Sequence, residues 1–293
     1  MGLSSTIDLS KPFLPESLTP LYYTSIYKNL SEREKIRYNQ LQGLYFNEQF
    51  MFFEGLLPQR IASALLKHSR YHEYKAGLDE MAKDEASHYK LFRRLNKACA
   101  PELYKDNDFF FVKPPPALVS IWKHLGNNPI RFPLILWLVL IQEERAVYYG
   151  KCFARDKEKL DSKFCKIHLK HLEDEGSHCD HGATITNAVW TQKSKLARKV
   201  NAFLLQWVLN EFFTAPKRSG MTVIDHWLTE FPELQGSRSI IKKEYYNFNQ
   251  NKAWVSSLYG KEVISMSLNC MKSHDEFSNI VHFYDALPNI KYS

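Results

Sequence analysis

Two histidines and a glutamate recur on one face of a predicted helix in the middle of the chain. They are His171, Glu175 and His178, within the stretch HLEDEGSH that covers residues 171–178. On an α-helix, offsets of four and seven residues return to within about 40° of one another, so the three side chains share one stripe. Imidazole and carboxylate groups are ligands of divalent transition metals. The spacing therefore predicts a metal site on this helix.

Part of this stretch occurs a second time, earlier in the chain. Residues 84–88 read DEASH and residues 174–178 read DEGSH, identical at four of five positions. A single Glu-x-x-His is a weak signal, because an acidic turn of helix is usually just solvated. Recurrence of the longer pattern is much rarer by chance. It adds Glu85 and His88 to the candidate ligands.

Four long helices are predicted to carry these residues. Ser31 and Glu34 form a capping box that starts the first helix, which runs to about residue 67 with a break near Pro58. The second helix ends near residue 98, the third runs from about 129–133 to about 153, and the fourth follows a charged turn. A long connection lies between the second and third helices. Because no strand pattern rises above background, the predicted class is all-α.

The domain prediction is a single unit over residues 1–293. Residues 1–30 are expected to form an arm, 31–190 the core bundle, and 191–293 extra helices and a tail, one of them started by a second capping box of Ser273 and Glu276. Hydrophobic residues make up 44% of the chain and aromatic residues 14%, which is enough for a sizeable core.

Two helix pairs joined by polar turns predict two antiparallel hairpins. Residues that face each other in a hairpin lie at equal distances from its turn. Reflection of Glu175 through the turn of its hairpin gives Glu144, and reflection of Glu85 through the other turn gives Glu54. Each Glu-x-x-His is therefore predicted to face a carboxylate on the preceding helix.

The same reasoning leaves two alternatives open. Glu143 is adjacent to Glu144, and Glu48 stands one and a half turns before Glu54, although its mirror point falls in the apolar stretch 64–66. The preferred site takes one glutamate from each of two helices and a Glu-x-x-His from each of the other two. Four carboxylates neutralise two divalent ions, and this donor set suits Fe(II), with Mn(II) as the alternative.

An aspartate stands directly before the glutamate of each Glu-x-x-His. Asp84 and Asp174 can each accept an imidazole N–H from a ligand histidine across the bundle, and the alternative is a solvated surface aspartate. The complete set of predicted metal ligands is Glu54, Glu85, His88, Glu144, His171, Glu175 and His178.

With these spacings the chain resembles the ferritin-like di-iron oxygenases, and within them the arylamine N-oxygenases typified by p-aminobenzoate N-oxygenase. The distinguishing residue is His171, a third histidine one turn before the last Glu-x-x-His. The resemblance covers residues 40–185 and implies a ferritin-like four-helix bundle with additional C-terminal helices, two iron ions and O2 as co-substrate. It also implies a division of the ligands between the two irons, with some glutamates bridging. One iron takes Glu54, Glu85 and His88, and the other takes Glu144, His171, Glu175 and His178.

The function that this resemblance implies is O2-dependent oxidation of a small organic substrate, such as an aryl amine. An external electron donor, a ferredoxin or a reductase, is expected because no flavin or nicotinamide fingerprint is present. The alternatives are a di-iron hydroxylase, desaturase or oxidative-cleavage enzyme on a non-amine substrate, and a non-catalytic metal-binding helical protein. Phe92 stands where ribonucleotide reductase small subunits carry a radical tyrosine, which argues against radical storage. The candidate residues for a substrate pocket are Tyr45, Met51, Trp137 and Tyr148. Aromatic residues at helical spacing belong to the hydrophobic core more often than to a pocket.

The charge distribution and the cysteines limit which partners and which cellular location we expect. The net charge of +7 is spread without a long basic run, and no nucleic-acid motif is present, so no nucleic-acid partner is expected. The most apolar stretch, 132–141, is far below the roughly 20 residues that cross a bilayer. The five cysteines form no Cys-x-x-Cys pair, and with no recognisable signal peptide we expect reduced thiols and a cytoplasmic location. A homodimer is left open.

Overall fold

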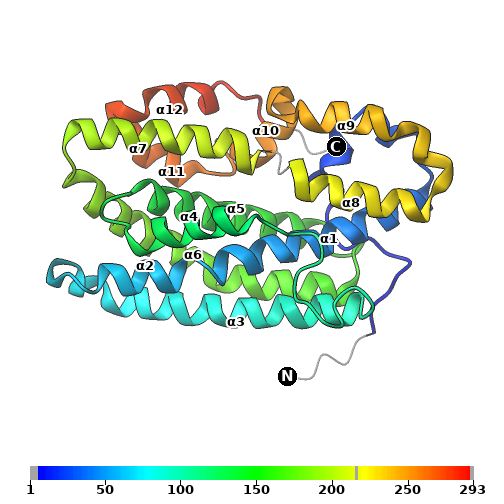
Figure 1. The fold of residues 1–293 in the computed structure, drawn as a ribbon, viewed down its shortest axis with the longest axis horizontal. Helices are drawn as coiled ribbons and strands as arrows, with labels where there is room; N and C mark the ends of the chain where they lie inside the picture. Colours follow the sequence, from blue (N-terminus) through cyan, green and yellow to red (C-terminus); the bar gives the residue numbers. More distant parts are fainter. Residues whose placement is uncertain (1–5, 215–216, 291–293) are drawn as a thin grey trace.

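Four long helices form the centre of the molecule, a computed structural model that describes residues 6–214 and 217–290. They are α1 (Glu32–Glu54), α3 (Lys75–Cys99), α5 (Leu134–Asp156) and α6 (Ser162–Thr191). α1 packs along α3, α5 packs along α6, and the two hairpins meet through α3 and α6 (Figure 1). No strand occurs among the described residues, so the all-α prediction and the two predicted hairpins are confirmed.

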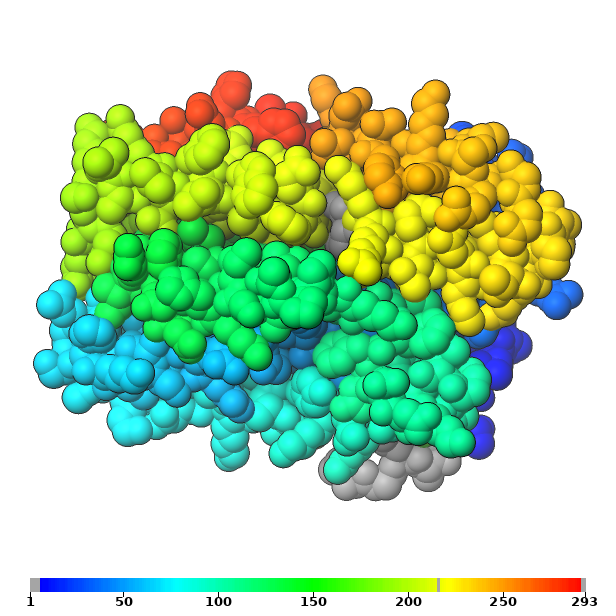
Figure 2. Space-filling model, in the orientation of Figure 1, coloured from blue at the N-terminus to red at the C-terminus, as the bar shows by residue number. Residues whose placement is uncertain are grey.

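The remaining helices cover the bundle and complete the chain. α7 packs against α5, α11 packs against α5 and α6, and α8 packs against α1 (Figure 1). Figure 2 shows residues 195–246 in the upper part of one face and residues 100–127 below them, from the middle to the lower right. The bounds are α2 (Pro58–Leu65), α4 (Pro116–Asn127), α7 (Lys195–Val208), α8 (Lys217–Glu230), α9 (Arg238–Tyr246), α10 (Lys252–Tyr259), α11 (Ser265–Lys272) and α12 (Ser278–Asp285), with a π-helical turn at Leu209–Phe213 after α7.

Local sequence signals set the ends of the bundle helices. Ser31 accepts a hydrogen bond from the backbone N–H of Glu34, whose carboxylate accepts one from the Ser31 N–H, so the predicted capping box is confirmed. α1 ends at Glu54 and α2 begins at Pro58, the predicted break. Asp161 caps α6 by accepting from the N–H of Phe164, and its second oxygen accepts from Asp8 in the N-terminal arm.

The second predicted capping box is wrong. Ser273 is the C-cap of α11 and its hydroxyl donates to the carbonyl of Cys270. Glu276 instead accepts a hydrogen bond from Arg198 of α7. Glu276, which the local motif assigned to a helix cap, therefore forms a long-range ion pair with Arg198 instead.

The two helices of the second hairpin approach each other closely at Gly150 of α5. A Cβ atom at this position would lie 2.8 Å from the Cβ of Leu172 in α6, closer than real Cβ contacts. This contact holds α5 near the helix that carries residues 171–178. The buried hydrophobic side chains form one connected cluster from Phe13 to Tyr284. No helix among the described residues is both long and apolar enough to cross a lipid bilayer.

Candidate metal centre

Six of the seven predicted ligands converge in the interior of the four-helix bundle, and a seventh acid joins them. Two groups of side chains form, and within each group the potential ligand atoms lie within 4.8 Å of one another. All members are buried. The first group is Glu54, His88 and His171, and the second is Glu85, Glu143, Glu175 and His178.

The structure places Glu143, rather than the preferred Glu144, in this cluster. The carboxylate of Glu144 accepts hydrogen bonds from the backbone N–H groups of Met266 and Ser267, 2.6 and 2.7 Å away, at the start of α11. Successive helix residues are about 100° apart, so the two acids point to different sides of α5. Reflection through the hairpin turn therefore gave the neighbour of the acid that faces the cluster.

The contacts of the two carboxylates distinguish Glu48 from Glu54, the other alternative that the sequence left open. Glu54 lies 3.3 Å from Nε2 of His171. Glu48 is fully buried elsewhere, where it accepts hydrogen bonds from the hydroxyl of Tyr104 and from the backbone N–H groups of residues 110–112. Glu54 therefore lies in the cluster, and Glu48 contacts the connection that follows α3.

Two glutamates contact histidines of both groups. The oxygens of Glu85 lie 3.8 Å from Nδ1 of His88 and 3.2 Å from Nδ1 of His178. Oε1 of Glu175 lies 2.7 Å from Nε2 of His171, 3.6 Å from Nδ1 of His88 and 3.8 Å from Nδ1 of His178. This grouping differs from the expected division of ligands, because His171 lies with Glu54 and His88.

Each Glu-x-x-His histidine is paired with the aspartate of the other copy. Nε2 of His88 in α3 donates a hydrogen bond to Asp174 in α6, at 3.3 Å. Nε2 of His178 in α6 lies 3.5 Å from Asp84 in α3. The predicted hydrogen bond across the bundle is present for His88, whereas His178 lies near Asp84 without a hydrogen bond to it. In both rings Nδ1 faces the cluster.

The electrostatics of these buried groups are those of closely spaced acids and bases. Burial, with the charge of Glu85 next, raises the pKa of Glu54 to about 7. Burial, then the nearby Glu175 and Glu85 carboxylates, hold the pKa of Glu143 well above its usual value. Although burial alone lowers the pKa of His171, Glu175 and Glu54 bring it well above the ordinary value. Without cations, the cluster must keep protons on some acids to relieve their repulsion.

The donor set meets the requirements of two divalent metal ions. Several buried atoms in the cluster form no hydrogen bond among the described residues, including both oxygens of Glu85 and of Glu175 and Nδ1 of His88 and of His178. Buried polar atoms without partners are costly unless a ligand uses them. Four carboxylates supply the charge that two divalent cations require, and three imidazoles complete an N/O donor set.

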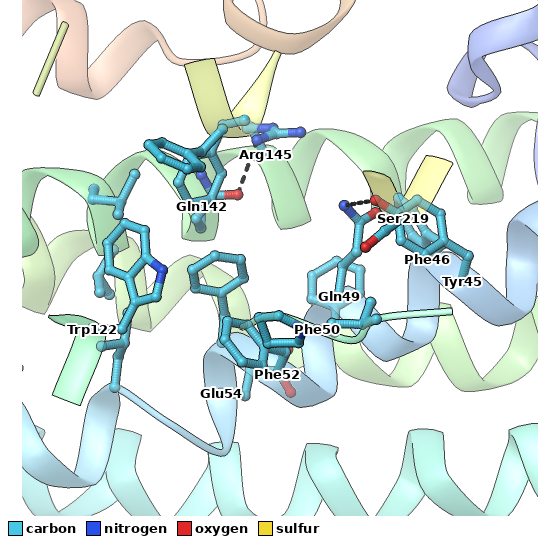
Figure 3. Close-up of a pocket in the computed structure, with 18 of the residues that line it drawn as sticks. Tyr45, Phe46, Gln49, Phe50, Phe52, Glu54, Trp122, Gln142, Arg145 and Ser219 are labelled. Carbon is cyan, nitrogen blue, oxygen red and sulfur yellow. Dashed lines mark hydrogen bonds between the residues drawn. The ribbon is translucent and has the colours of Figure 1, made fainter. Parts of the chain in front are cut away.

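An apolar cavity of about 420 Å³ opens beside this cluster. Glu54 and Glu143 form part of its wall, and other residues of α1 and α5, with residues 112–115 of the connection before α4, supply most of the rest (Figure 3). Tyr45, one of the four predicted pocket residues, lines the cavity. Trp137 is wrong for that role, since it packs against Trp190 and Phe277 in the core. Met51 and Tyr148 are buried and are not among the residues that line it.

Sequence reasoning missed most of the cavity wall. The wall residues come from the phases of α1 and α5 next to the ligands and from the connection after α3, as with Phe50, Gln142, Arg145 and Val112. The available signal was the run Gln142-Glu143-Glu144-Arg145, which places four polar residues directly after the most apolar stretch of a buried helix.

Comparison with known families gives one match. Residues 4–244, most of the chain, match the family described as P-aminobenzoate N-oxygenase AurF. No curated protein and no solved structure matches the chain.

Proposed function

The chain belongs to the p-aminobenzoate N-oxygenase family of arylamine N-oxygenases, which has the ferritin-like di-iron fold, and on that premise we propose which of its residues hold the metals and where its substrate binds. The family and the buried carboxylate–histidine cluster imply a metal centre in an oxidoreductase. The identity of the metal, the ligands, the substrate and the electron donor are the proposals.

The proposed metals are two iron ions. His88 and His178 would bind through Nδ1, which faces the cluster, because Asp174 and Asp84 occupy their Nε2 sides. His171 would bind through Nε2, and Glu54 and Glu143 would bind at the ends of the pair. Glu85 and Glu175 would also hold the ions, and each contacts histidines of both groups. When bound and reduced, the two irons supply the electrons and coordination positions that activate O2.

The proposed substrate is an aryl amine bound in the cavity. The observation that carries this proposal is that Glu54 and Glu143 belong both to the cluster and to the cavity wall. Phe50 and Phe53 line the same space and offer ring faces against which an aromatic substrate packs. Phe50 also packs edge-on against His171, with ring centroids 4.9 Å apart, so the apolar wall reaches the ligands themselves.

The experiment is product analysis after a single reduction. The purified chain is loaded with Fe(II) without oxygen, mixed with 4-aminobenzoate or aniline and a chemical reductant, and exposed to O2. We expect hydroxylamine, nitroso or nitro products and about two irons per chain. Glu175→Ala is the control, because it removes a candidate ligand from the centre of the cluster and should lose both iron and product. A ring-hydroxylated product would favour the hydroxylase alternative, and a stable wild-type protein that binds no iron would reject the enzyme.

Three further proposals concern the surroundings of the enzyme. An external ferredoxin or reductase would supply electrons to the metals. A cytoplasmic location is supported by five cysteines that all carry free thiols. A homodimer is supported by an exposed apolar stripe on α7, spaced four, three and four residues apart as in paired helices. The stripe consists of Leu196, Val200, Phe203 and Trp207.

A further inference from the structure

Solvent comes close to the metal cluster at the face that α3 and α6 form together. The side chain of Asp174 in α6 is 44% exposed, and it accepts the hydrogen bond from Nε2 of His88 in α3. Nδ1 of the same ring lies 3.6 Å from Glu175, inside the cluster. One imidazole ring therefore separates an exposed carboxylate from the candidate ligands. On other sides of the bundle, α7 and α11 pack against α5, and α8 packs against α1.

The surface around Asp174 carries small side chains. Ser87, Gly176 and Ser177 are exposed. A Cβ atom added to Gly176 would meet no described atom of another residue within 4 Å. A protein docked on this surface can therefore bring a redox group close to His88. Closeness decides the rate, because electron transfer between proteins slows steeply with distance.

A basic patch borders this point on both helices. We call Lys90, Arg94, Lys166 and Lys170, all exposed, the α3–α6 basic patch. Lys170 and Lys166 stand four and eight residues before Asp174, so these three side chains lie within about 80° of one another on α6. The two helices run antiparallel, because position 88 lies beside 174 and position 84 beside 178. Position 94 then lies beside position 168, which places Arg94 between Lys166 and Lys170 across the groove.

The cations of this patch have no acidic partners among the described residues. Arg93 and Lys97, on another side of α3, both pair with Asp108, at 2.7 and 3.3 Å. No such ion pair is formed by the four members of the patch, and the exposed Glu173 beside them pairs with none. Clustered like charges repel one another, and a surface of one sign attracts a partner of the other. The patch is therefore complementary to an acidic protein.

We propose that the α3–α6 basic patch docks an acidic one-electron donor protein beside Asp174 and His88. Two reduced donor molecules each give up one electron, two Fe(III) ions become Fe(II), and no covalent bond forms or breaks. The opposite charges would steer the donor to this face and raise its association rate. The cavity is lined mainly by α1 and α5, so donor and substrate would approach from different sides. This inference rests on the proposed function, because it gives the external donor its chemistry and its docking surface.

The test is binding of an acidic plant-type [2Fe–2S] ferredoxin to the full chain, measured by calorimetry. At low salt we expect Arg94→Glu/Lys166→Glu to weaken binding roughly 10- to 30-fold. The matched control is Lys243→Glu/Lys252→Glu, which makes the same change in net charge at two exposed lysines of α9 and α10 and should weaken binding by less than about twofold. At about 0.5 M salt the wild type should bind much more weakly, and the difference between the variants should nearly vanish.

A rapid-mixing measurement of iron reduction separates docking from the metals. Reduced ferredoxin should reduce the iron of the patch variant more slowly than that of the wild type, whereas a neutral reduced phenazine dye should reduce both equally. Iron content should be unchanged, since no member of the patch is a candidate ligand. Lys90→Glu/Lys170→Glu, which changes the other two members, should give the same losses and decides if the first variant does not fold.

Several outcomes would overturn the proposal. They are no ferredoxin binding by the wild type at low salt, an unchanged affinity in both patch variants, and an equal loss in the control. Equally tight binding of a DNA oligonucleotide, lost in the same variants, would also overturn it, since the patch would then hold any polyanion. If only the proposed function fails, ferredoxin still binds at the patch and no N-oxidised product forms. If only the docking surface fails, the phenazine dye supports N-oxidation and ferredoxin binding ignores the patch.

Discussion

Glu143 and Glu144 are consecutive acids in α5 with different tasks. Glu143 faces the cluster, 3.8 Å from Nδ1 of His178, among three other buried carboxylates. Glu144 faces the start of α11 and accepts two backbone N–H groups there. The first N–H groups of a helix lack partners within that helix, and an anion at this end is favoured by the helix dipole. One acid therefore serves the proposed metal site and its neighbour attaches the C-terminal helices to the bundle.

This division predicts different losses for two matched substitutions. Glu143→Gln removes a candidate ligand, so we expect iron content after anaerobic loading to fall well below that of the wild type. The metal-free variant should be no less stable than the metal-free wild type, because one source of acid repulsion is gone. Glu144→Gln should retain iron but lose about 1–3 kcal/mol of stability, because an amide N–H₂ then faces backbone donors. Metal analysis and chemical denaturation of both variants measure these effects, and the reverse pattern would restore Glu144 as the ligand.

The sequence predicts those residues of the site that depend on one helix alone. The offsets within 171–178 and 84–88 follow from helix geometry, so they identify five of the ligand candidates and the aspartates behind them. Glu143 depends on the phase of one helix against another, and an error of one residue rotates a side chain by about 100°. Glu48 could not be resolved, because its partners are backbone groups in a connection without regular structure. The position of Arg145 in the cavity wall could not be predicted either, because several helices together enclose that cavity.

At the scale of elements, the connection from α3 to α4 is held by a buried side chain of α1 as well as by the ion pair of Asp108 with Arg93 of α3. Glu48 of α1 receives the Tyr104 hydroxyl and three consecutive backbone N–H groups of this connection. Residues 112–115, which follow directly, form part of the cavity wall. A buried carboxylate on one helix thus supplies the hydrogen-bond partners for backbone N–H groups of a segment that forms part of the cavity wall.

The predicted effect of Glu48→Gln is a loss of roughly 1.5–3 kcal/mol of stability, the range for hydrogen bonds to a charged group. The amide can accept on one side only, so at least one backbone N–H of the connection stays unpaired. Denaturant unfolding measures the loss, and hydrogen exchange at residues 110–112 should accelerate. Glu32→Gln, an exposed glutamate of the same helix, is the control and should change stability by less than about 0.5 kcal/mol. Equal effects of the two substitutions would contradict the proposed role of Glu48.

Within α6, His168 gives the protein a pH-dependent stability. Its ring is buried, stacks on Phe153 with centroids 4.2 Å apart and is hydrogen-bonded through Nε2 to Asn47. Burial lowers the pKa of His168 well below its usual value. In the unfolded chain this ring takes up a proton near pH 6.5, whereas in the folded chain it stays neutral. The free energy of unfolding therefore falls as the pH drops below 6.5, and this group does not affect it above that pH.

We expect His168→Gln to remove up to about 1.4 kcal/mol per pH unit from the slope of stability against pH below 6.5. The measurement is denaturant unfolding of the metal-free proteins from pH 5 to 8, with the slopes compared rather than the absolute stabilities. Above pH 7 the two slopes should agree, which serves as the internal control. An identical slope below pH 6.5 would mean that the folded protein protonates this ring.

At the scale of the whole molecule, the helices that follow the bundle contact residues of α5 next to the cluster and the cavity. The family match ends at residue 244, yet later residues contact the site region. α11 receives Glu144, and the ring of Tyr259 in α10 packs under the guanidinium of Arg145. We therefore propose that residues 1–293 fold as one domain, because neither the bundle nor the C-terminal helices keep these contacts alone.

The outer face of that C-terminal layer carries the proposed dimer contact. Phe203 is 68% exposed and lies in the middle of the α7 stripe. Two copies of a stripe with this spacing can pack against each other around a twofold axis, each burying the apolar side chains of the other. We expect the wild type to sediment as a dimer and Phe203→Glu as a monomer with an unchanged Fe(II) content, since α7 supplies none of the candidate ligands. Ile121→Glu on α4, 54% exposed, is the matched control and should remain dimeric. A monomeric wild type, or dissociation by both substitutions alike, would remove α7 as the interface.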